Sequence, residues 1–435
     1  MAIPTIFFYT IGCRLNASET AALQAAFVLD GQFRVVDQGD AADIVVINTC
    51  TVTGKGDADC RQWVIRLAKR NPAVRIALIG CQAQTQKDKL AAWPNVFWVV
   101  GTSRKMDLPA IIRETLGAEV PRPAVIVPEI SVDNFRVFHP STAQSRTRPN
   151  LKIQDGCDAF CAFCEVPFAR GRSRSREFAD LLDEARQWVG QGHKELVVTG
   201  VNIGAYHDQD FRLADVLAAL LAINGLQRLR ISSIEPHSAN DAILDLMRTN
   251  PKFCRHLHIP LQSASDAVLQ RMKRRHTFAD VARFMERAKA AVPGICLGGD
   301  VIVGFPGETE ERFAETKARL RDLAVDYLHV FSYSDREFAA SKDFSPKVAP
   351  AIISQRSAVL RQLSSQKRRC FHQTLIGQKI SVLFEEQKSA GWSGLTDNYV
   401  RVYAPNLENL ANRLETVQIL SLAREGVIGA IAAEK

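Results

Sequence analysis

The stretch DGCDAFCAFCEVPFARGRSRSR, residues 155–176, holds three cysteines close together. Cys157, Cys161 and Cys164, here called the loop triad, have the spacing C-x3-C-x2-C, which is typical of metal ligation. A structural zinc site needs four ligands, and no further Cys or His follows before His193. A ferredoxin-type motif has a fourth cysteine before its proline, whereas Glu-Val-Pro follows Cys164. Three thiolates leave one coordination position open, which favours a reactive iron–sulfur cluster over zinc.

Three more cysteines each follow an apolar run that we predict to be a strand. Cys13 lies in IGCRLN, Cys50 in NTCTVT and Cys81 in GCQAQ, and we call them the strand-end triad. A single such cysteine is often just a small buried apolar side chain. Because the carboxyl ends of parallel strands share one edge of a sheet, we expect these three to converge on a second metal site. The other cysteines lack this placement and are interpreted as structural: Cys60, Cys254, Cys296 and Cys370.

Composition sets the class of protein. The chain has 435 residues, 46% hydrophobic and 23% charged, which predicts a large core and several domains. Its net charge of +8 indicates a polyanionic partner. Clustered cysteines favour metal ligation in a reducing compartment over disulfides. No apolar run approaches the ~20 residues of a membrane helix, and the N-terminus does not resemble a signal peptide, so we expect no membrane association and a cytoplasmic location.

The pattern of strands and helices predicts an α/β fold in four segments. Residues 1–117 alternate strand-like and helical runs, which is typical of a doubly wound parallel sheet. Residues 118–149 contain five prolines and are interpreted as a connecting segment in which a short strand stays open. Residues 150–370 resume the strand–helix alternation, and residues 371–435 alternate in the manner of a small β-barrel.

Six strands are expected in the third segment, and they predict a partial (β/α)6 TIM-like barrel. Catalytic residues of such barrels lie at the carboxyl ends of strands, and the loop triad follows the first strand directly. The expected strands of the N-terminal sheet are residues 5–12, 42–49, 74–80 and 95–101. Those of the partial barrel are residues 151–154, 195–200, 228–235, 256–262, 298–305 and 326–334.

The loop triad resembles that of the radical S-adenosylmethionine superfamily, in which three cysteines hold a 4Fe-4S cluster whose fourth iron binds S-adenosylmethionine. Phe163 matches the aromatic position that packs beside the adenine. The same resemblance implies cofactor contacts at the ends of later strands, although each of these residues also fits a turn, a cap or a core-bonding role. They are Gly200 in VVTGVN, Glu235 in RISSIEP, Gln262 in HIPLQSAS, and Asp300 and Gly304 in GGDVIVGF.

Over nearly its whole length the chain resembles the methylthiotransferase family. GCRLNASE, VVTGVNIGAY, RISSIEP and DVIVGFPGETEE are most similar to the branch that acts on threonylcarbamoyladenosine beside the tRNA anticodon. Ala264 departs from the family, which usually has glycine there. TDNYVRVYAPN resembles the TRAM domain, an RNA-binding β-barrel, and this implies RNA contacts by Tyr399 and Arg401.

The resemblance implies two 4Fe-4S clusters and S-adenosylmethionine as cofactors. The loop-triad cluster would give one electron to S-adenosylmethionine, and the adenosyl radical would activate C2 of the adenine. The cluster on the strand-end triad, with Cys50 as a catalytic ligand, would carry the sulfur or methylthio group. Implied partners are the tRNA anticodon arm, an electron donor of the flavodoxin or ferredoxin class, and a sulfur donor.

Arginines recur at every second position after the loop triad. Arg170, Arg172, Arg174 and Arg176 would present one side of an extended segment to RNA phosphates, and a solvated charge run is the alternative. Other functions also stay open. They are methylthiolation of isopentenyladenosine in tRNA, methylthiolation of a ribosomal-protein aspartate, and a non-catalytic, metal-bearing RNA-binding protein.

Overall fold

The computed structural model of the chain divides into two compact units. The residues that it describes are 3–116, 123–131, 147–389, 391–405 and 408–432. Unit one comprises Met1–Ser145, Lys152–Arg176 and Ser334–Lys342, and unit two comprises Arg146–Leu151, Glu177–Tyr333 and Asp343–Lys435. The loop triad therefore lies in the same compact unit as the N-terminal sheet.

Unit one is built on a six-stranded parallel sheet of order β2-β1-β3-β4-β5-β6. Its strands are β1 (Thr5–Thr10), β2 (Arg34–Val35), β3 (Ile44–Thr49), β4 (Arg75–Gly80), β5 (Val96–Val100) and β6 (Ala124–Ile126). The four predicted strands are confirmed, and β6 is the short strand left open in the connecting segment. The strand order reverses between β1 and β3, and ligands of open parallel sheets bind outside the carboxyl ends at such a point.

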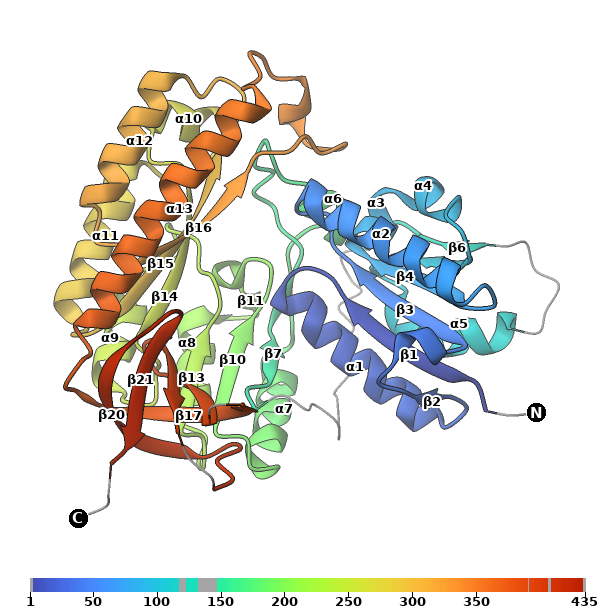
Figure 1. Cartoon of the computed structure of the whole chain (residues 1–435), viewed down its shortest axis with the longest axis horizontal. Coiled ribbons are helices and arrows are strands. Elements are labelled where there is room, and N and C mark those ends of the chain that lie inside the picture. The colour runs from blue at the N-terminus through green and yellow to red at the C-terminus, as the bar shows by residue number, and fades with distance from the viewer. Residues whose placement is uncertain (1–2, 117–122, 132–146, 390, 406–407, 433–435) are drawn as a thin grey trace. The chain divides into compact units, whose positions relative to one another are not determined.

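Helices cover both faces of this sheet. One face packs against α1 (Arg14–Asp30) and α5 (Leu108–Thr115). The other packs against α2 (Gly54–Arg70), α3 (Cys81–Thr85) and α4 (Lys87–Ala91). Consecutive residues of a strand point to opposite faces, so a strand buried on both sides is apolar throughout. Figure 1 shows the sheet and its helices in blue and cyan.

The remainder of unit one is short. β8 (Gln154–Asp155) and β9 (Arg174–Ser175) pair antiparallel on either side of the loop triad and α6 (Val166–Arg170). Among the described residues, unit one also contains the short helices η1 (Gly39–Ala41) and η2 (Lys105–Asp107). A third short helix, η4 (Ala340–Asp343), begins in unit one.

Unit two contains six parallel strands in chain order, which confirms the predicted partial barrel. They are β7 (Asn150–Lys152), β10 (Glu195–Thr199), β13 (Arg228–Ile231), β14 (His256–Gln262), β15 (Cys296–Val303) and β16 (Tyr327–Ser332). They form two three-stranded sheets, β13-β10-β7 and β14-β15-β16, joined by a parallel bridge between Ser233 and His258. The boundary between the units falls within β7.

Helices alternate with these strands. The helices are α7 (Phe178–Gly190), α8 (Leu213–Leu221), α9 (Asp241–Thr249), α10 (Asp266–Arg271), α11 (Phe278–Ala291), α12 (Glu310–Asp322) and α13 (Pro350–Gln373). Figure 1 shows α11, α12 and α13 beside β14, β15 and β16. A small hairpin, β11 (His207–Asp208) and β12 (Phe211–Arg212), and η3 (Ile203–Ala205) follow β10.

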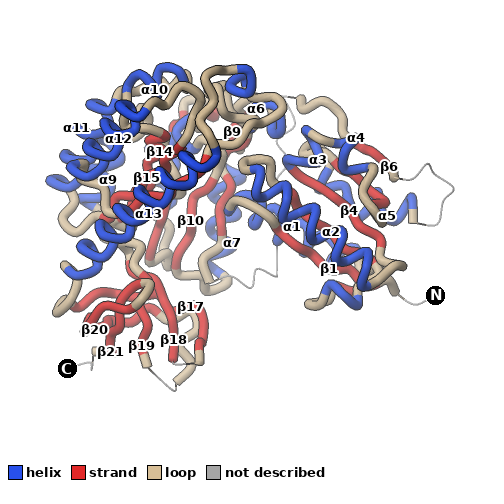
Figure 2. The backbone as a smooth tube through the Cα atoms, turned by 45° about the horizontal axis from the view of Figure 1, so that its top comes forward, coloured by secondary structure: helices blue, strands red, loops and turns tan. Residues whose placement is uncertain are grey.

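The C-terminal segment is a closed five-stranded barrel of order β17-β18-β19-β21-β20, as predicted (Figure 2). Its strands are β17 (Lys379–Lys388), β18 (Gly391–Thr396), β19 (Arg401–Ala404), β20 (Leu414–Ala423) and β21 (Gly426–Ile431). Two buried arginines of β13 hold it: Arg228 donates to the carbonyl of Leu395, and Arg230 to that of Thr396. Among the described residues, no helix is long and apolar enough to cross a membrane.

Candidate metal centre

The strand-end triad occupies the carboxyl ends of three neighbouring strands. Cys13 precedes α1, Cys50 directly follows β3, and Cys81 is the first residue of α3 after β4. Gly12 has a φ of +105°, and a Cβ added there would lie only 2.5 Å from Cβ of Cys50. The ends of β1 and β3 therefore touch. Cys50 and Cys81 are buried, and Cys13 is exposed.

Polar side chains hold these strand ends together. Thr49 Oγ1 accepts hydrogen bonds from the backbone N–H groups of Gln82 (3.1 Å) and Ala83 (3.3 Å), which fixes the start of α3. Asn16 Nδ2 donates to the carbonyls of Ile11 and Thr49, both at 2.9 Å. The positions of all three cysteines thus depend on buried side-chain hydrogen bonds as well as on the sheet.

The loop triad follows β8 on a tight turn. Gly156 has a φ of +72°, and a Cβ at this position would lie 2.0 Å from the carbonyl oxygen of Arg172. Only glycine fits there, because both the left-handed backbone and the close approach exclude a side chain. The three cysteines are partly exposed.

Both triads contain sulfur atoms that accept a hydrogen bond from the backbone N–H two residues later. The N···S distance is 3.5 Å for Cys50 and 3.4 Å for Cys157 and Cys164. Burial, with a smaller contribution from the neighbouring Cys81, raises the pKa of Cys50 to about 12. Hydrogen bonds to sulfur favour a bound thiolate and tune the potential of an iron–sulfur cluster.

Glu165 joins the two triads within unit one. The hydroxyl of Thr51, next to Cys50, donates to Glu165 Oε2 at 2.5 Å, and Glu165 is next to Cys164. Glu165 Oε1 also accepts from the backbone N–H of Phe338 at 2.9 Å. This buried carboxylate therefore connects the end of β3, the loop triad and residues 334–342.

A buried ionic cluster, here called the Glu19 network, gathers residues that flank both triads in the chain. Glu19 contacts Lys105, Lys152 (2.9 Å) and Arg170 (3.0 Å), while Asp155 contacts Lys152 at 2.7 Å and Arg170 at 3.1 Å. Each member is more than nine-tenths buried. The network consists of Glu19, Lys105, Lys152, Asp155, Arg170 and Arg174, so four cations face two carboxylates.

The arginine repeat does not form one exposed side. Arg170, Arg174 and Arg176 are buried, whereas the side chain of Arg172 is 60% exposed. The prediction that Arg170 binds RNA phosphate is therefore wrong for the described structure, because its guanidinium is enclosed and bonded to Glu19. The alternation assumed one extended segment, whereas Arg170 ends helix α6 and β9 contains only Arg174 and Ser175.

The spacing of the sulfur atoms bears on the choice between zinc and a cluster. With Zn–S bonds of about 2.3 Å, two sulfurs on one tetrahedral zinc lie about 3.8 Å apart. Among the described residues, three potential metal ligands have their ligand atoms within 4.8 Å of one another at one place, and they are His258, Asp300 and His329, not cysteines. At least one sulfur pair in each cysteine triad is farther apart. This spread, with buried cations nearby, fits an anionic polynuclear cluster better than a single zinc ion.

The predicted S-adenosylmethionine contacts are divided between the units. Gly200, Gln262 and Gly304 lie at or directly after the carboxyl ends of β10, β14 and β15, as expected. Glu235 is bonded to Arg274 at 2.5 Å. Phe163 belongs to unit one and the other predicted contacts to unit two, so their grouping into one site stays a prediction.

Asp300 lies within β15 and not at its end, directly opposite His329 of β16. Its Oδ1 is 3.3 Å from Nε2 of His258 and 3.4 Å from Nδ1 of His329. Burial opposes its ionisation, but the two neighbouring histidine side chains outweigh burial and lower the pKa of Asp300 to about 2. The sequence did not indicate that either histidine contacts Asp300, although strand alternation places His258 and Asp300 on equivalent faces.

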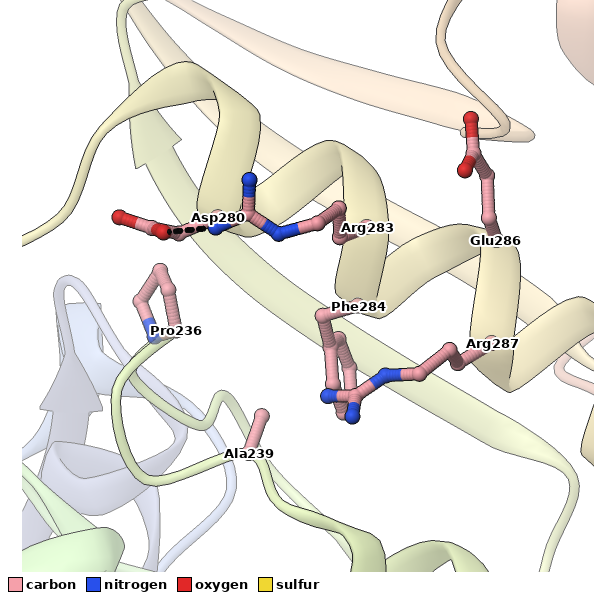
Figure 3. A pocket seen from close by; sticks show the side chains of 7 residues that line it. All are labelled: Pro236, Ala239, Asp280, Arg283, Phe284, Glu286 and Arg287. Carbon is pink, nitrogen blue, oxygen red and sulfur yellow. Dashed lines mark hydrogen bonds and ion pairs between the residues drawn. The ribbon is translucent and has the colours of Figure 1, made fainter.

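A pocket of about 410 Å³ lies apart from these strand ends, between the loop after β13 and helix α11 (Figure 3). Its arginines already have carboxylate partners: Arg283 contacts Asp280 at 2.5 Å, and Arg287 contacts Asp241 at 3.2 Å. Both arginines of the pocket are therefore already paired.

Two family models match the chain. The Radical SAM superfamily model matches residues 151–320, and the model described as Uncharacterized protein family UPF0004 matches residues 5–101. The first covers the loop triad, and the second covers the strand-end triad. Each triad thus lies in a separately recognised region of sequence.

Curated relatives match almost end to end. The chain is 36% identical to "Threonylcarbamoyladenosine tRNA methylthiotransferase MtaB" of Bacillus subtilis over 96% of this chain and 94% of that protein. It is 35% identical to the protein of the same name from Aquifex aeolicus, over 91% and 96%. Among solved structures, the radical S-adenosylmethionine methyltransferase TsrM of Kitasatospora setae has a TM-score of 0.55 at 19% identity, over 75% of this chain and 73% of that one. This structural likeness supports the fold alone.

Iron content tests the strand-end triad. Replacing Cys50 with alanine removes one of its three thiolates, so we expect iron per chain to fall by about half after anaerobic reconstitution, with loss of one of two clusters. Cys60→Ala is the matched control, because Cys60 is also buried but lies on α2 and packs in the apolar core. Equal iron in the two variants and the parent would contradict the second metal site.

Proposed function

This chain belongs to the MtaB type of the radical S-adenosylmethionine methylthiotransferase family, and we propose that it adds a methylthio group to C2 of N6-threonylcarbamoyladenosine next to the anticodon of tRNA. Members of this family use S-adenosylmethionine and 4Fe-4S clusters. The relatives' names support tRNA as the substrate. They favour neither isopentenyladenosine nor a ribosomal-protein side chain.

The observation that carries this proposal is the joining of two cysteine triads through Thr51 and Glu165 within one compact unit. A sulfur-insertion enzyme needs a site that activates a C–H bond and a nearby site that holds sulfur. A non-catalytic RNA-binding protein has no need for two open three-thiolate sites that are linked in one unit.

We assign the two metal sites to the six cysteines. Cys157, Cys161 and Cys164 would hold one cluster through three thiolates, and the strand-end triad would hold the other. When bound, the clusters and S-adenosylmethionine would supply the electron, the adenosyl radical and the transferred methylthio group. The chain itself fixes the sulfur ligands by N–H···S bonds and keeps Cys50 and Cys81 out of water.

We assign the S-adenosylmethionine contacts to Phe163 and to residues near the strand ends of unit two. Gly304, with a φ of +82°, directly follows β15, and a Cβ there would lie 2.3 Å from the side chain of Ile353. Gln262, with a φ of +71°, ends β14. Asp300 is ionised and can accept from ligand hydroxyls. Gly200 and Glu235 complete this proposed set.

Arg172 is the proposed RNA contact beside the loop triad. Its guanidinium lies 5.1 Å above the ring of Phe160, and it is paired with the exposed Asp158 at 3.2 Å. Phe160, Phe168 and Phe338 form a row of rings with centroids 5.9 and 5.6 Å apart, each at least 40% exposed. Exposed aromatic rings next to arginine are typical of surfaces that stack unpaired bases.

The C-terminal barrel is the second proposed RNA contact, as a TRAM-like module. Arg401 is 37% exposed and pairs with Glu385 at 2.9 Å, so its guanidinium can exchange that partner for phosphate. Tyr399 stacks on His256 with ring centroids 4.2 Å apart. Its ring is therefore already packed, and Arg401 is the stronger candidate.

The remaining assignments follow from the family. We propose a methylthiotransferase segment at 1–117, a connecting segment at 118–149, a radical S-adenosylmethionine barrel at 150–370 and an RNA-binding barrel at 371–435. We also propose a flavodoxin- or ferredoxin-class electron donor and a separate sulfur donor. The proposed location is the cytoplasm, where tRNA and reducing conditions are present.

Mass spectrometry of tRNA nucleosides tests the function. The reconstituted protein is incubated anaerobically with S-adenosylmethionine, a reductant, sulfide and threonylcarbamoyl-modified tRNA. We expect a methylthio mass increment on that nucleoside and release of 5′-deoxyadenosine. Cys161→Ala should abolish both products, whereas Cys50→Ala should abolish the increment and keep some 5′-deoxyadenosine, because only the loop triad generates the radical. Full product from the Cys50 variant would refute the assigned roles.

Binding of tRNA tests the aromatic row. Replacing Phe168, its central ring, with alanine should weaken binding of the anticodon arm about 5- to 150-fold, since stacking on one base is worth about 1–3 kcal/mol. The matched control is Phe211→Ala, because Phe211 is exposed in unit two and stacks on Phe178. Fluorescence anisotropy with labelled tRNA measures the affinity of both variants. Equal affinity of the two variants would show that the row binds no base.

A further inference from the structure

The Glu19 network carries more positive than negative charge in a fully buried place. Among the residues that the structure describes, four cations face the carboxylates of Glu19 and Asp155, which leaves a buried excess of two positive charges. Unbalanced buried charge is costly, and ion pairs in protein interiors are usually matched. Burial, followed by repulsion from Arg170 and Lys152, lowers the pKa of Lys105, whereas Glu19 raises it. The network by itself is short of negative charge.

Arg170 brings this excess charge to the strand-end triad. Its Nη2 donates to Oδ1 of Asn16 at 2.7 Å, and the same Oδ1 is 3.9 Å from Sγ of Cys13. The buried amide oxygen of Asn16 thus bridges the guanidinium of Arg170 and the first cysteine of the strand-end triad. The positive charge of Arg170 therefore lies next to this triad.

Arg170 is also tied to the loop triad. It ends α6, which begins two residues after Cys164, and its guanidinium makes two hydrogen bonds to Glu19, at 3.0 Å each. Glu19 lies on α1, one helical turn after Asn16 and on the same side of that helix. A change in the position of α6 would thus move the charge next to the strand-end triad.

We propose that Arg170 is a positioning residue that sets the reduction potential of the cluster on the strand-end triad, with the Glu19 network as its support. This inference rests on the two clusters of the proposed function and adds a residue-level control of one of them. The three thiolates and their cluster would supply the negative charge that the network lacks. Reduction adds an electron, so a nearby cation stabilises the reduced cluster and raises its potential, and a nearby carboxylate lowers it.

The charge model predicts opposite shifts from two substitutions in the same network. Arg170→Met removes a positive charge and should lower the midpoint potential. Glu19→Gln removes a negative charge and should raise it. Arg170→Lys keeps the charge while losing the paired hydrogen bonds, so its potential should stay close to that of the parent. A purely structural role would not produce shifts of opposite sign.

The experiment is an EPR-monitored redox titration of the full-length protein in which all three loop-triad cysteines are alanine, so that only the strand-end cluster is loaded. We expect shifts of at least 59 mV, a tenfold change in the ratio of reduced to oxidised cluster, downward for Arg170→Met and upward for Glu19→Gln. Arg230→Met is the matched control, because Arg230 is equally buried and paired with Glu195 in unit two. It should leave the potential unchanged.

Equal potentials in all variants, or shifts of the same sign for Arg170→Met and Glu19→Gln, would overturn the proposal. If Arg170→Met does not fold, the other two variants still test the proposal. The midpoint potential should rise in Glu19→Gln and stay unchanged in Arg170→Lys. The titration uses neither tRNA nor S-adenosylmethionine. Failure of this inference is therefore distinct from failure of the proposed function, which the nucleoside measurement reports.

Discussion

The hydrogen bond between Thr51 and Glu165 is the constraint on which the rest of unit one depends. It links the residue after Cys50 to the residue after Cys164, across more than a hundred positions of sequence. Through its other oxygen, Glu165 also holds residues 334–342, which return from the partial barrel. Two sulfur-rich sites that belong to different sequence families are thereby fixed in one compact unit, and this proximity is what a sulfur-insertion reaction requires.

The parallel sheet explains why the second site can exist. Strand order reverses between β1 and β3, and Cys13 and Cys50 lie at the carboxyl ends of these two strands. Helices cover both faces of the sheet, and every residue of β3 is buried. In the proposed arrangement, the buried cations of the Glu19 network would balance thiolate charge that apolar surroundings alone would disfavour.

Much of this architecture could be predicted from sequence because it depends on local patterns. Apolar runs followed by helical runs predicted both sheets, and the position of each cysteine after such a run predicted the strand-end triad. β2 has only two residues, too few for any periodicity to show. The role of Arg170 could not be predicted, because its partner Glu19 lies far away in the chain, and because Arg170 ends a helix rather than continuing the expected extended segment. The pairing of Asp300 with His329 likewise depends on the register of two strands.

The central claim is that the two clusters lie close together in one unit, and EPR spectroscopy of the doubly reduced protein tests it most directly. Two neighbouring paramagnetic clusters interact, which splits or broadens their signals. The account predicts that the spectrum of the parent protein differs from the sum of the spectra of Cys50→Ala and Cys161→Ala, each of which retains one cluster. A parent spectrum equal to that sum, with both clusters present by iron analysis, would contradict it.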